Sequence, residues 1–544
     1  MTCHLLRKTA AATTLSWGLG LLASAPAFAA ANLAVNDTSI EPSRFTSFLQ
    51  FVVTRSGNTG FAALVDYATV DGTALAGRDY TSTHGTLSFA PGQVQLVVDV
   101  PLVGKPVPQA RSFTLALSNP VAQPATGRVW VEAGSASIGR SPQGAVVADF
   151  NGDGLPDVAM SSATSSAPAI TLLRNDTAKK AKQANFTALA SLPVVAAPMR
   201  LGSADLNRDG RPDLVTSVTD TTAISVFLNT TPVGAADLRF DRSDVALGDS
   251  ATTDVAFADF DGDGVVDVVL ATGFGSKALV LRNTTPAGAT QPTLTLAASL
   301  PGSPQAGSYS YVVRTLDVNG DGKPDIAVGN LLSADVSLLL NTTPAGGPIR
   351  FAPPIAVSLP GGVSGMDVAD LDGDGRPDIV TADNDSQQTG STFSVLLNRT
   401  PTGSARPVFT VSSRSDGAPY EVRLADMDGD GKPDLVFTNL VADDFSNGAM
   451  VIYLNKTAPG ADAPALTRDF AAFIADEPHA LAVGDFNGDG KADVVSADFV
   501  SFSDAGPSAR FLFGQKPAKD PKATLIDASG TATLTPKARS ASAR

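Results

Sequence analysis

Cysteine and histidine are almost absent from the sequence. One cysteine, Cys3, and three histidines occur in 544 residues, so no intramolecular disulfide can stabilise the fold. Zinc and copper sites depend on thiolate and imidazole ligands and are disfavoured for the same reason. The sequence also lacks a G-x-S-x-G motif, an H-E-x-x-H motif and a cysteine nucleophile with a nearby histidine. These absences argue against the common hydrolase and metalloprotease classes.

Long apolar runs and positive charge are also scarce. No segment offers the roughly 20 uninterrupted apolar residues that a membrane span needs. The formal net charge is −15, which argues against nucleic acid and anionic membrane surfaces as partners. Aromatic residues make up 6% of the chain, whereas glycine (49) and proline (37) are plentiful between short runs of Val, Thr, Leu and Ala. This composition is typical of an all-β protein with many turns.

The first 29 residues have the features of an export signal. Arg7 and Lys8 provide positive charge, an apolar stretch follows over residues 10–22, and Ala27-Phe28-Ala29 fits the small-x-small cleavage rule. The apolar stretch is too short to anchor the chain in a membrane. We therefore expect an exported bacterial protein, secreted or periplasmic, with residues 1–29 removed.

One acidic motif occurs seven times along the chain. Each copy follows the pattern D-x-[DN]-x-D-G-x-x-D, and successive copies begin 53 to 59 residues apart. Seven copies at such even spacing exclude coincidence. Repetition at this period indicates a repeat architecture.

Each copy supplies hard oxygen ligands on a tight loop. Positions 1, 3, 5 and 9 carry carboxylate or amide oxygens, position 7 can turn its backbone carbonyl inward, and position 6 is always glycine. Ca²⁺ takes about six to eight oxygens with tolerant geometry, whereas Mg²⁺ demands a regular octahedron and keeps its waters. We therefore predict about seven Ca²⁺ ions, one per copy. The predicted ligands are Asp149, Asn151, Asp153, Leu155 and Asp157; Asp205, Asn207, Asp209, Arg211 and Asp213; Asp259, Asp261, Asp263, Val265 and Asp267; Asp317, Asn319, Asp321, Lys323 and Asp325; Asp370, Asp372, Asp374, Arg376 and Asp378; Asp426, Asp428, Asp430, Lys432 and Asp434; and Asp485, Asn487, Asp489, Lys491 and Asp493.

Acidic solvated turns and EF-hands are the alternatives to this interpretation. The seven loops hold 24 of the 54 acidic residues, and a bound cation removes the repulsion between carboxylates held this close. An EF-hand requires a bidentate glutamate at position 12. That position is occupied by Met160, Thr216, Leu270, Val328, Thr381, Phe437 and Ser496. The segments after the loops, such as DVAMSS and DVVLAT, are apolar and β-prone, so strands flank the loops.

Each repeat contains four short strands. Strands enter and leave the acidic loop, a third strand ends in sequences such as VFLN and LVLRN, and a more variable fourth strand follows. Glycine, proline, asparagine and aspartate occupy the turns between them. Four-stranded sheets repeated radially form a β-propeller. We therefore predict a seven-bladed β-propeller over residues 136–519.

The repeats resemble the FG-GAP/VCBS family, whose best-known members form the seven-bladed propeller of integrin α chains. The resemblance rests on the acidic loop and covers residues ~140–515. It implies that the loop joins the first two strands of each blade and holds Ca²⁺. Integrin propellers carry such loops in only some blades, whereas all seven repeats carry one here, as in bacterial members of the family.

Several copies read Asn-x-Thr after the third strand, as at Asn229 and Asn341. This pattern fits a glycosylation acceptor, and it also fits a turn in which asparagine tolerates unusual backbone angles. Because the sequence has bacterial features, we favour the turn.

Residues 30–135 contain no copy of the repeat. Apolar and polar residues alternate there between turn signals, which predicts an antiparallel β-sandwich. The string YATVDGTALAGRDYTSTHGTLSFAPGQ, followed by FTLALSNP, resembles a Calx-β domain, and some members of that family bind Ca²⁺ through acidic residues. This chain has GKPVPQARS where such acids are expected, and only Glu41, Asp71 and Asp79 remain as candidate ligands. We therefore expect this domain to be structural or adhesive.

Two function classes fit these features. The first is an exported, monomeric calcium-binding β-propeller scaffold that binds or adheres to an extracellular protein or glycan. The second is a propeller-based hydrolase or lyase acting on extracellular polysaccharide, which requires Asp, Glu, Tyr or His outside the loops to converge on the central channel. We favour the first and predict no enzymatic activity, with His479 an ordinary surface or blade-edge residue and ligand contacts at the inserts 383–392 and 441–449.

The last 25 residues, 520–544, contain one β-prone stretch, ATLIDA. We expect it to form the outer strand of the last blade and the remainder to be disordered.

Overall fold

The computed structural model describes residues 31–40, 48–57, 62–89, 94–103, 109–123, 129–138, 141–163, 168–248, 251–384, 391–415, 417–440, 448–473, 478–498, 508–515, 523–527 and 529–534. Every regular element in these ranges is a β-strand, which confirms the all-β class. Among the same residues, no helix has the length and apolar character to cross a membrane. The predicted export signal lies outside the described residues, as do the central parts of both inserts.

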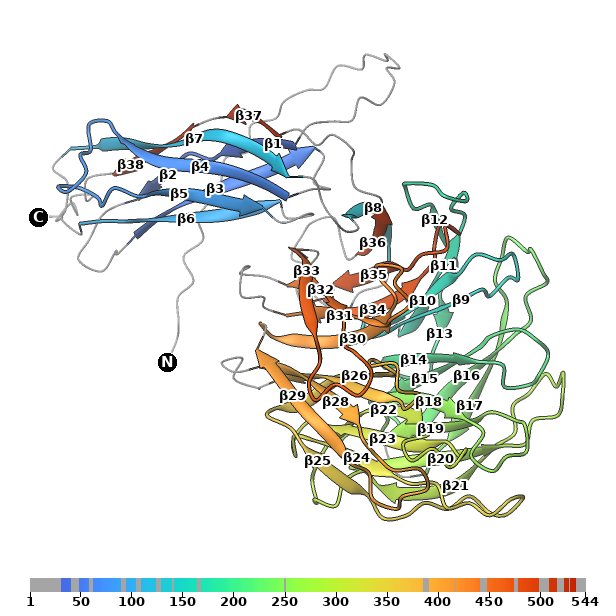
Figure 1. The fold of residues 1–544 in the computed structure, drawn as a ribbon. Coiled ribbons are helices and arrows are strands. Elements are labelled where there is room, and N and C mark those ends of the chain that lie inside the picture. The colour runs from blue at the N-terminus through green and yellow to red at the C-terminus, as the bar shows by residue number, and fades with distance from the viewer. Residues whose placement is uncertain are drawn as a thin grey trace, which may run out of the picture.

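Two sheets form the N-terminal β-sandwich (Figure 1). Their strand orders are β37-β1-β3-β6 and β2-β38-β7-β4-β5. The bounds are β1 (Ala31–Val35), β2 (Thr38–Ile40), β3 (Phe48–Gly57), β4 (Ala62–Asp71), β5 (His84–Phe89), β6 (Gln95–Pro101), β7 (Arg111–Gln123), β37 (Ala523–Asp527) and β38 (Ser529–Leu534). Apolar side chains such as Phe51, Val65 and Phe113 are buried between the sheets, because alternate residues of a strand point to the same face.

The C-terminal strands belong to the sandwich rather than to the propeller. β37 pairs in parallel with β1, and β38 pairs in parallel with β2 and antiparallel with β7. The prediction that Ala523–Asp527 forms the outer strand of the last blade was therefore wrong. The prediction that the residues after it are disordered was wrong for Ser529–Leu534, which form β38. The place of the outer strand is taken by β8 (Val129–Ser137), which pairs with the third strand of the last blade, so the predicted domain boundary at residue 135 falls inside a propeller strand.

Seven further sheets follow the sandwich, each built around four antiparallel strands in sequential order. They are blade 1, β9 (Ala145–Ala148), β10 (Asp157–Ser162), β11 (Ala169–Asn175) and β12 (Phe186–Ala188), with β13 (Leu192–Pro193) beside β11; blade 2, β14 (Pro198–Ala204), β15 (Asp213–Val218), β16 (Ala223–Asn229) and β17 (Phe240–Ala246); blade 3, β18 (Asp254–Ala258), β19 (Asp267–Ala271), β20 (Lys277–Asn283) and β21 (Leu294–Pro301); blade 4, β22 (Ser310–Leu316), β23 (Asp325–Asn330), β24 (Asp335–Leu339) and β25 (Ile355–Ser358); blade 5, β26 (Gly362–Ala369), β27 (Asp378–Asn384), β28 (Thr392–Asn398) and β29 (Phe409–Ser415); blade 6, β30 (Pro419–Ala425), β31 (Asp434–Asn439), β32 (Ala449–Asn455) and β33 (Leu466–Phe473); and blade 7, β34 (Pro478–Gly484), β35 (Asp493–Asp498), β36 (Ser508–Gln515) and β8.

The seven sheets form a closed ring. The first strand of each blade contacts the first strand of the next, in the order β9, β14, β18, β22, β26, β30 and β34, and β34 contacts β9 again. These strands therefore surround a central axis, which confirms the predicted seven-bladed propeller (Figure 1). Blade 7 combines β34–β36 with β8 from before blade 1, so pairing between distant parts of the chain closes the ring.

The burial of each strand follows from the packing of neighbouring blades against each other in the ring. The second strands, such as Asp157–Ser162 and Asp325–Asn330, are buried at every residue, because neighbouring blades cover both faces of each sheet. Outer strands such as Phe240–Ala246 alternate between exposed and half-buried residues. Mostly apolar runs in the sequence therefore correspond to the second and third strands of a blade. Alternation of exposed and less exposed residues is typical of the outermost strands.

Candidate metal centres

Each acidic loop joins the first and second strands of its blade. In blade 3, β18 ends at Ala258, the loop begins at Asp259, and its last aspartate, Asp267, is the first residue of β19. The same junction occurs in all seven blades. The loops therefore leave the ring on one common face, at the end of the inner strands.

Backbone hydrogen bonds hold the loop carboxylates in place. In blade 3 the first carboxylate, Asp259, accepts from the backbone N–H groups of Gly262 (2.8 Å), Asp263 (3.1 Å) and Gly264 (2.8 Å). The Asp263 carboxylate accepts from the N–H of Val265 at 2.9 Å. Gly264 has φ +82°, a left-handed conformation that a side chain would oppose. The glycine at position 6 donates to the first aspartate in all seven loops.

Three loops bring three carboxylates together. Their ligand atoms all lie within 4.8 Å of one another, in the groups Asp259, Asp261 and Asp263; Asp370, Asp372 and Asp374; and Asp426, Asp428 and Asp434. In the other four loops an asparagine stands at position 3, at residues 151, 207, 319 and 487, and offers an amide oxygen instead. Such a set of hard, mostly anionic oxygens suits Ca²⁺. The side chains at position 7 have different partners. Lys323 donates to the Thr343 carbonyl at 2.9 Å, whereas Arg211 and Arg376 form ion pairs with the position 5 carboxylates of their own loops. The predicted role of the position 7 carbonyl stays a prediction.

The aspartate at position 9 is fully buried in every loop. In blade 1, Asp157 accepts from the backbone N–H of Phe150 (3.0 Å) and of Asn175 (2.8 Å). Burial raises the pKa of this carboxyl although the N–H groups oppose the shift. The pKa is about 7 for Asp157, Asp325 and Asp493 and about 6 for Asp213, Asp267, Asp378 and Asp434. A cation beside these groups would favour the ionised form.

Metal-free protein should lose stability as the pH rises from about 4 to about 7. In this window the folded protein binds more protons than the unfolded chain, whose aspartates titrate near about 3.9, so the free energy of unfolding falls with rising pH. Ca²⁺ binds the ionised carboxylates, so the difference between melting temperatures with calcium and with chelator should widen over the same window. Thermal melts at a series of pH values measure it, and a difference independent of pH would contradict this expectation.

Basic side chains accompany the loops that have a fourth aspartate. Each such loop pairs its position 3 carboxylate with a cation from the end of the third strand. The pairs are Arg282 Nε with Asp261 (2.6 Å), Arg399 Nη2 with Asp372 (2.9 Å) and Lys456 Nζ with Asp428 (2.6 Å). These cations offset the additional carboxylate. Sequence reasoning missed them because the pairing depends on the fold.

The asparagine that ends the third strand links neighbouring blades. Its side-chain amide donates to the carbonyl of loop position 2 in the preceding blade. The bonds are Asn175 to Phe486 (2.9 Å), Asn229 to Phe150 (2.8 Å), Asn283 to Leu206 (2.9 Å), Asn341 to Phe260 (3.0 Å), Asn398 to Val318 (2.9 Å) and Asn455 to Leu371 (2.8 Å). The recurrent Asn was visible in the sequence, but its role between blades was missed.

The same asparagines settle the Asn-x-Thr question. Asn229 and Asn341 are buried, and each accepts from the backbone N–H two residues later, at 2.9 Å from Thr231 and Thr343. This is an Asx turn. The interpretation as a turn is confirmed, because a buried amide that donates to backbone carbonyls cannot carry a glycan.

The candidate calcium ligands of the sandwich are bonded to protein groups. Arg111 forms an ion pair with Asp79 at 2.6 Å, and Asp71 accepts from the Tyr80 hydroxyl at 2.6 Å. The third candidate, Glu41, lies outside the described residues. A guanidinium thus neutralises Asp79, which supports the predicted structural role of this domain.

A polar cluster also lies inside the ring, away from the rim. Arg200 in β14 and Glu421 in β30 are both buried and form an ion pair. Burial opposes the charge on Glu421, but the guanidiniums of Arg200 and its neighbours hold the pKa of this carboxyl below its usual value. Arg200 also donates to the Ser364 carbonyl at 2.7 Å. A propeller-based enzyme would need acidic, tyrosine or histidine side chains outside the loops to converge on the central channel, and Glu421 meets part of this requirement.

Aromatic groups cross the axis next to this ion pair. The hydroxyls of Tyr311 and Tyr420 are 2.7 Å apart, and the His479 ring stacks on Tyr420 with centroids 4.0 Å apart. His479 lies in β34, the edge strand of blade 7 that faces the axis, which confirms the predicted blade-edge position. Burial and the nearby Arg200 lower the pKa of His479 to about 3, so this ring is neutral at physiological pH.

Comparisons with known proteins match both parts of the chain. The FG-GAP-like repeat matches residues 149–216, 205–270 and 293–381, the FG-GAP repeat matches residues 478–498, and the Calx-beta domain matches residues 29–138. A 69-residue stretch is 36% identical to sodium/calcium exchanger 1 of Canis lupus familiaris and of Bos taurus, covering 12% of this chain and 7% of each exchanger. The chain therefore spans only a small part of these relatives.

Solved structures match at low overall similarity. The apo form of the Calx CBD1 domain is 27% identical, with 16% of this chain and 82% of that chain covered and a TM-score of 0.15. A ctPRC2 complex with H3K27me3 and H3K27M is 13% identical, with 60% and 70% covered and a TM-score of 0.39. The propeller assignment rests instead on the strand pairing described above. The chain carries an N-terminal Calx-beta domain followed by FG-GAP-like repeats.

Proposed function

We propose that this protein is an exported calcium-binding scaffold whose propeller holds one Ca²⁺ in each blade and binds an extracellular protein or glycan. The observation that carries the proposal is the sevenfold recurrence of one oxygen-rich loop at the same strand junction. The proposed ligands are the five residues predicted in each loop. At these sites Ca²⁺ would supply charge neutralisation and cross-linking rather than chemistry.

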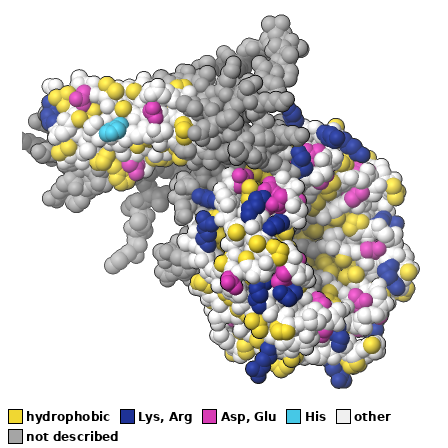
Figure 2. All heavy atoms as spheres, viewed as in Figure 1, with side chains coloured by type: hydrophobic (Ala, Val, Ile, Leu, Met, Phe, Trp, Pro, Cys, Tyr) yellow, Lys and Arg dark blue, Asp and Glu magenta, His cyan; other side chains and the backbone are white. Residues whose placement is uncertain are grey.

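Charge supports this assignment. The loops hold 24 of the 54 acidic residues, and the chain has a net charge of −15. Seven Ca²⁺ would offset most of it. Figure 2 shows acidic and basic side chains interspersed over the face in view. The loops are thus the places where a cation relieves the most repulsion.

The loops also connect blades, which gives calcium a structural role. In blade 1 the Asn151 carbonyl accepts from Gly234 of blade 2 at 2.6 Å, and in blade 7 the Asn487 carbonyl accepts from Lys180 of blade 1 at 2.7 Å. An ion that fixes one loop therefore fixes the contact with the next blade. A rigid ring of this kind suits a binding scaffold, whose contacts are carried by loops.

Replacing Asp263 with alanine should remove one of the seven ions. Asp263 is the position 5 ligand of blade 3, and blades contact mainly their neighbours, so the other sites should persist. Bound calcium counted by native mass spectrometry should fall from seven to six, with a modest loss of melting temperature. Asp241→Ala, an exposed aspartate on an outer strand, is the matched control. Seven ions in both variants, or loss of all ions in the first, would reject independent sites.

A propeller-based hydrolase or lyase remains the second candidate, favoured by the tyrosine, histidine and carboxylate cluster in the ring. FG-GAP and Calx-beta domains are typically non-catalytic. Within the cluster Tyr311 and Tyr420 bond each other, and Glu421 is fully engaged by arginine, so these groups face protein partners rather than substrate. Turnover assays on acidic and neutral polysaccharides in calcium buffer test this candidate. We expect binding without cleavage.

A further inference from the structure

A cavity of about 960 Å³ occupies the axis of the ring. Inner strands of all seven blades line it, and the loop residues Asp426, Asp485 and Lys491 lie at its border. It therefore reaches the face that carries the acidic loops. Toward the opposite face the hydrogen-bonded Tyr311 and Tyr420 span the axis. This space borders the proposed calcium sites of blades 6 and 7, extends from them along the inner strands, and has the size of a small-molecule site.

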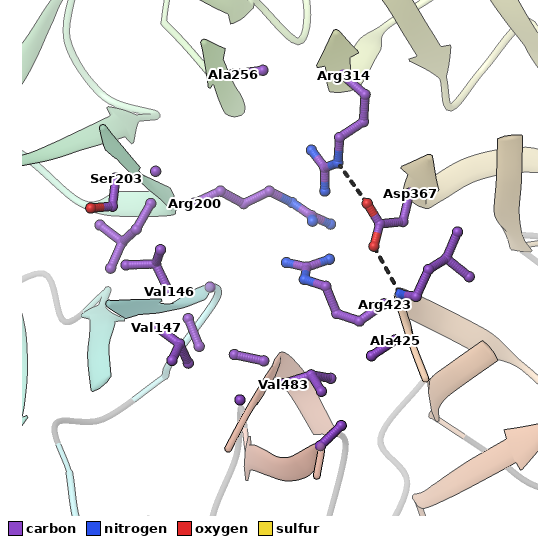
Figure 3. Close-up of a pocket in the computed structure, with 18 of the residues that line it drawn as sticks. Val146, Val147, Arg200, Ser203, Ala256, Arg314, Asp367, Arg423, Ala425 and Val483 are labelled. Atoms are coloured by element: carbon purple, nitrogen blue, oxygen red, sulfur yellow. Dashed lines mark hydrogen bonds and ion pairs between the residues drawn. The ribbon is translucent and has the colours of Figure 1, made fainter. Parts of the chain in front are cut away.

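Three guanidinium groups converge on this cavity. Arg200, Arg314 and Arg423 project from β14, β22 and β30 toward one point, with Asp367 between the last two (Figure 3). Arg314 Nη1 pairs with Asp254 at 2.8 Å, whereas its Nε is 3.8 Å from Asp367. These three arginines come from three different blades and make one end of the cavity polar.

The arginines are only partly used by protein acceptors. Arg423 donates through Nη1 to the Val422 carbonyl at 2.8 Å and to Glu421. Within the described part of the chain, its Nε and Nη2 form no hydrogen bond, and Nη2 of Arg314 has only Glu421 at 4.0 Å. The Arg423 and Arg314 side chains are 23% and 17% exposed, so protein atoms do not seal these N–H groups. These N–H groups are therefore available to a ligand from the cavity side.

The rest of the cavity restricts the ligand class. The wall beside the arginines is apolar and includes Val146, Val147, Ala256 and Val483 (Figure 3). Three acids, Asp254, Asp367 and Glu421, balance the three arginines, so the site has no surplus of positive charge for a dianion. A single carboxylate can take the planar guanidinium fork in bidentate fashion. An apolar group attached to that carboxylate would pack against the valine and alanine side chains of the cavity wall.

We propose that the channel cavity binds a small monoanion with one carboxylate and an apolar body, held by Arg423 and Arg314. The carboxylate accepts from Nε and Nη2 of Arg423 and from Nη2 of Arg314. Asp367 keeps the two guanidiniums apart, because it lies between them and accepts from the backbone N–H of Leu424 at 2.9 Å. This site goes beyond the proposed calcium scaffold, in which the loops alone have a role.

Benzoate titrated into the full mature chain in calcium buffer, followed by calorimetry, tests the proposal. Benzoate should bind at one site, and its neutral isostere benzamide and the dianion phenyl phosphate should bind at least about tenfold more weakly. Arg423→Gln should lower benzoate affinity by a similar factor. The matched control Arg406→Gln makes the same charge change at an exposed turn and should leave the affinity unchanged.

A second variant keeps the test decisive if Arg423→Gln fails to fold. Ala425→Phe places a large ring in the cavity wall without altering any charge, and it should abolish benzoate binding while calcium uptake stays at seven. Absence of benzoate binding, equal binding of benzamide, tighter binding of phenyl phosphate, or unchanged affinity in Ala425→Phe would each overturn the proposal. Because calcium is counted separately, failure of the scaffold proposal is distinguishable from failure of this site.

Discussion

Removing calcium is expected to lower the melting temperature of the mature protein by about 10 °C or more. Each ion that binds only the folded state stabilises it by mass action, by about 2.7 kcal/mol at a calcium concentration 100-fold above the dissociation constant. Several such sites act together on one ring. For a chain of this size, with about 2.1 cal/mol/K of unfolding entropy per residue, each kcal/mol shifts the melting temperature by roughly 1 °C.

Repulsion in the empty loops adds to this effect. In blade 5 the carboxylates of Asp370, Asp372 and Asp374 lie within 4.8 Å of one another, and Arg399 and Arg376 together compensate only part of the charge of this loop. The buried Asp378 below them carries a raised pKa of about 6, so it is mostly ionised at neutral pH. Without metal these charges weaken the contact between blades.

Thermal melts in calcium, in chelator and in magnesium at the same ionic strength measure the effect. Magnesium should restore little of the lost stability, because it demands a more regular coordination shell. Equal melting temperatures in calcium and chelator would show that the loops are stable as solvated turns.

Glu421→Gln is expected to destabilise the propeller by about 3–5 kcal/mol, the cost of leaving buried charges without their partner. Glu421 forms ion pairs with Arg200 and Arg423, and Arg314 lies 4.0 Å away. Glutamine keeps the shape but removes the negative charge, so three guanidiniums would face two carboxylates. Arg200, which is buried, would suffer most because burial disfavours an unpaired charge.

Chemical denaturation in calcium buffer measures this loss. Asp241→Asn removes the same charge from an exposed strand and should change the free energy of unfolding by less than about 0.5 kcal/mol. A Glu421→Gln variant as stable as this control would show that the arginines find other partners and that the cluster is not a buried network.

The sequence predicted the parts of this fold that repeat locally. The acidic loop, its glycine and the apolar strand after it are contiguous in the chain, and seven copies imply a ring. Strand exchange between distant segments could not be predicted. β8 and Ala523–Asp527 are both short and β-prone, and nothing in their own residues indicates that the first completes blade 7 and the second pairs with β1.

The candidate site shows the same division. The loop carboxylates could be assigned from spacing alone, and the structure places them together. The interblade bonds of Asn229 and its equivalents, and the pairing of Arg200 with Glu421, depend on contacts between different blades. Such contacts leave at most a recurrent asparagine or an isolated charge in the sequence, because side chains meet there only after the ring has closed.

Counting the calcium bound to the mature chain by native mass spectrometry tests the central claim most directly. The arrangement of seven equivalent loops predicts a dominant species with seven Ca²⁺ at micromolar to millimolar calcium. A chain that stays metal-free under these conditions, or that holds only one or two ions, would contradict the assignment of one ion to each blade.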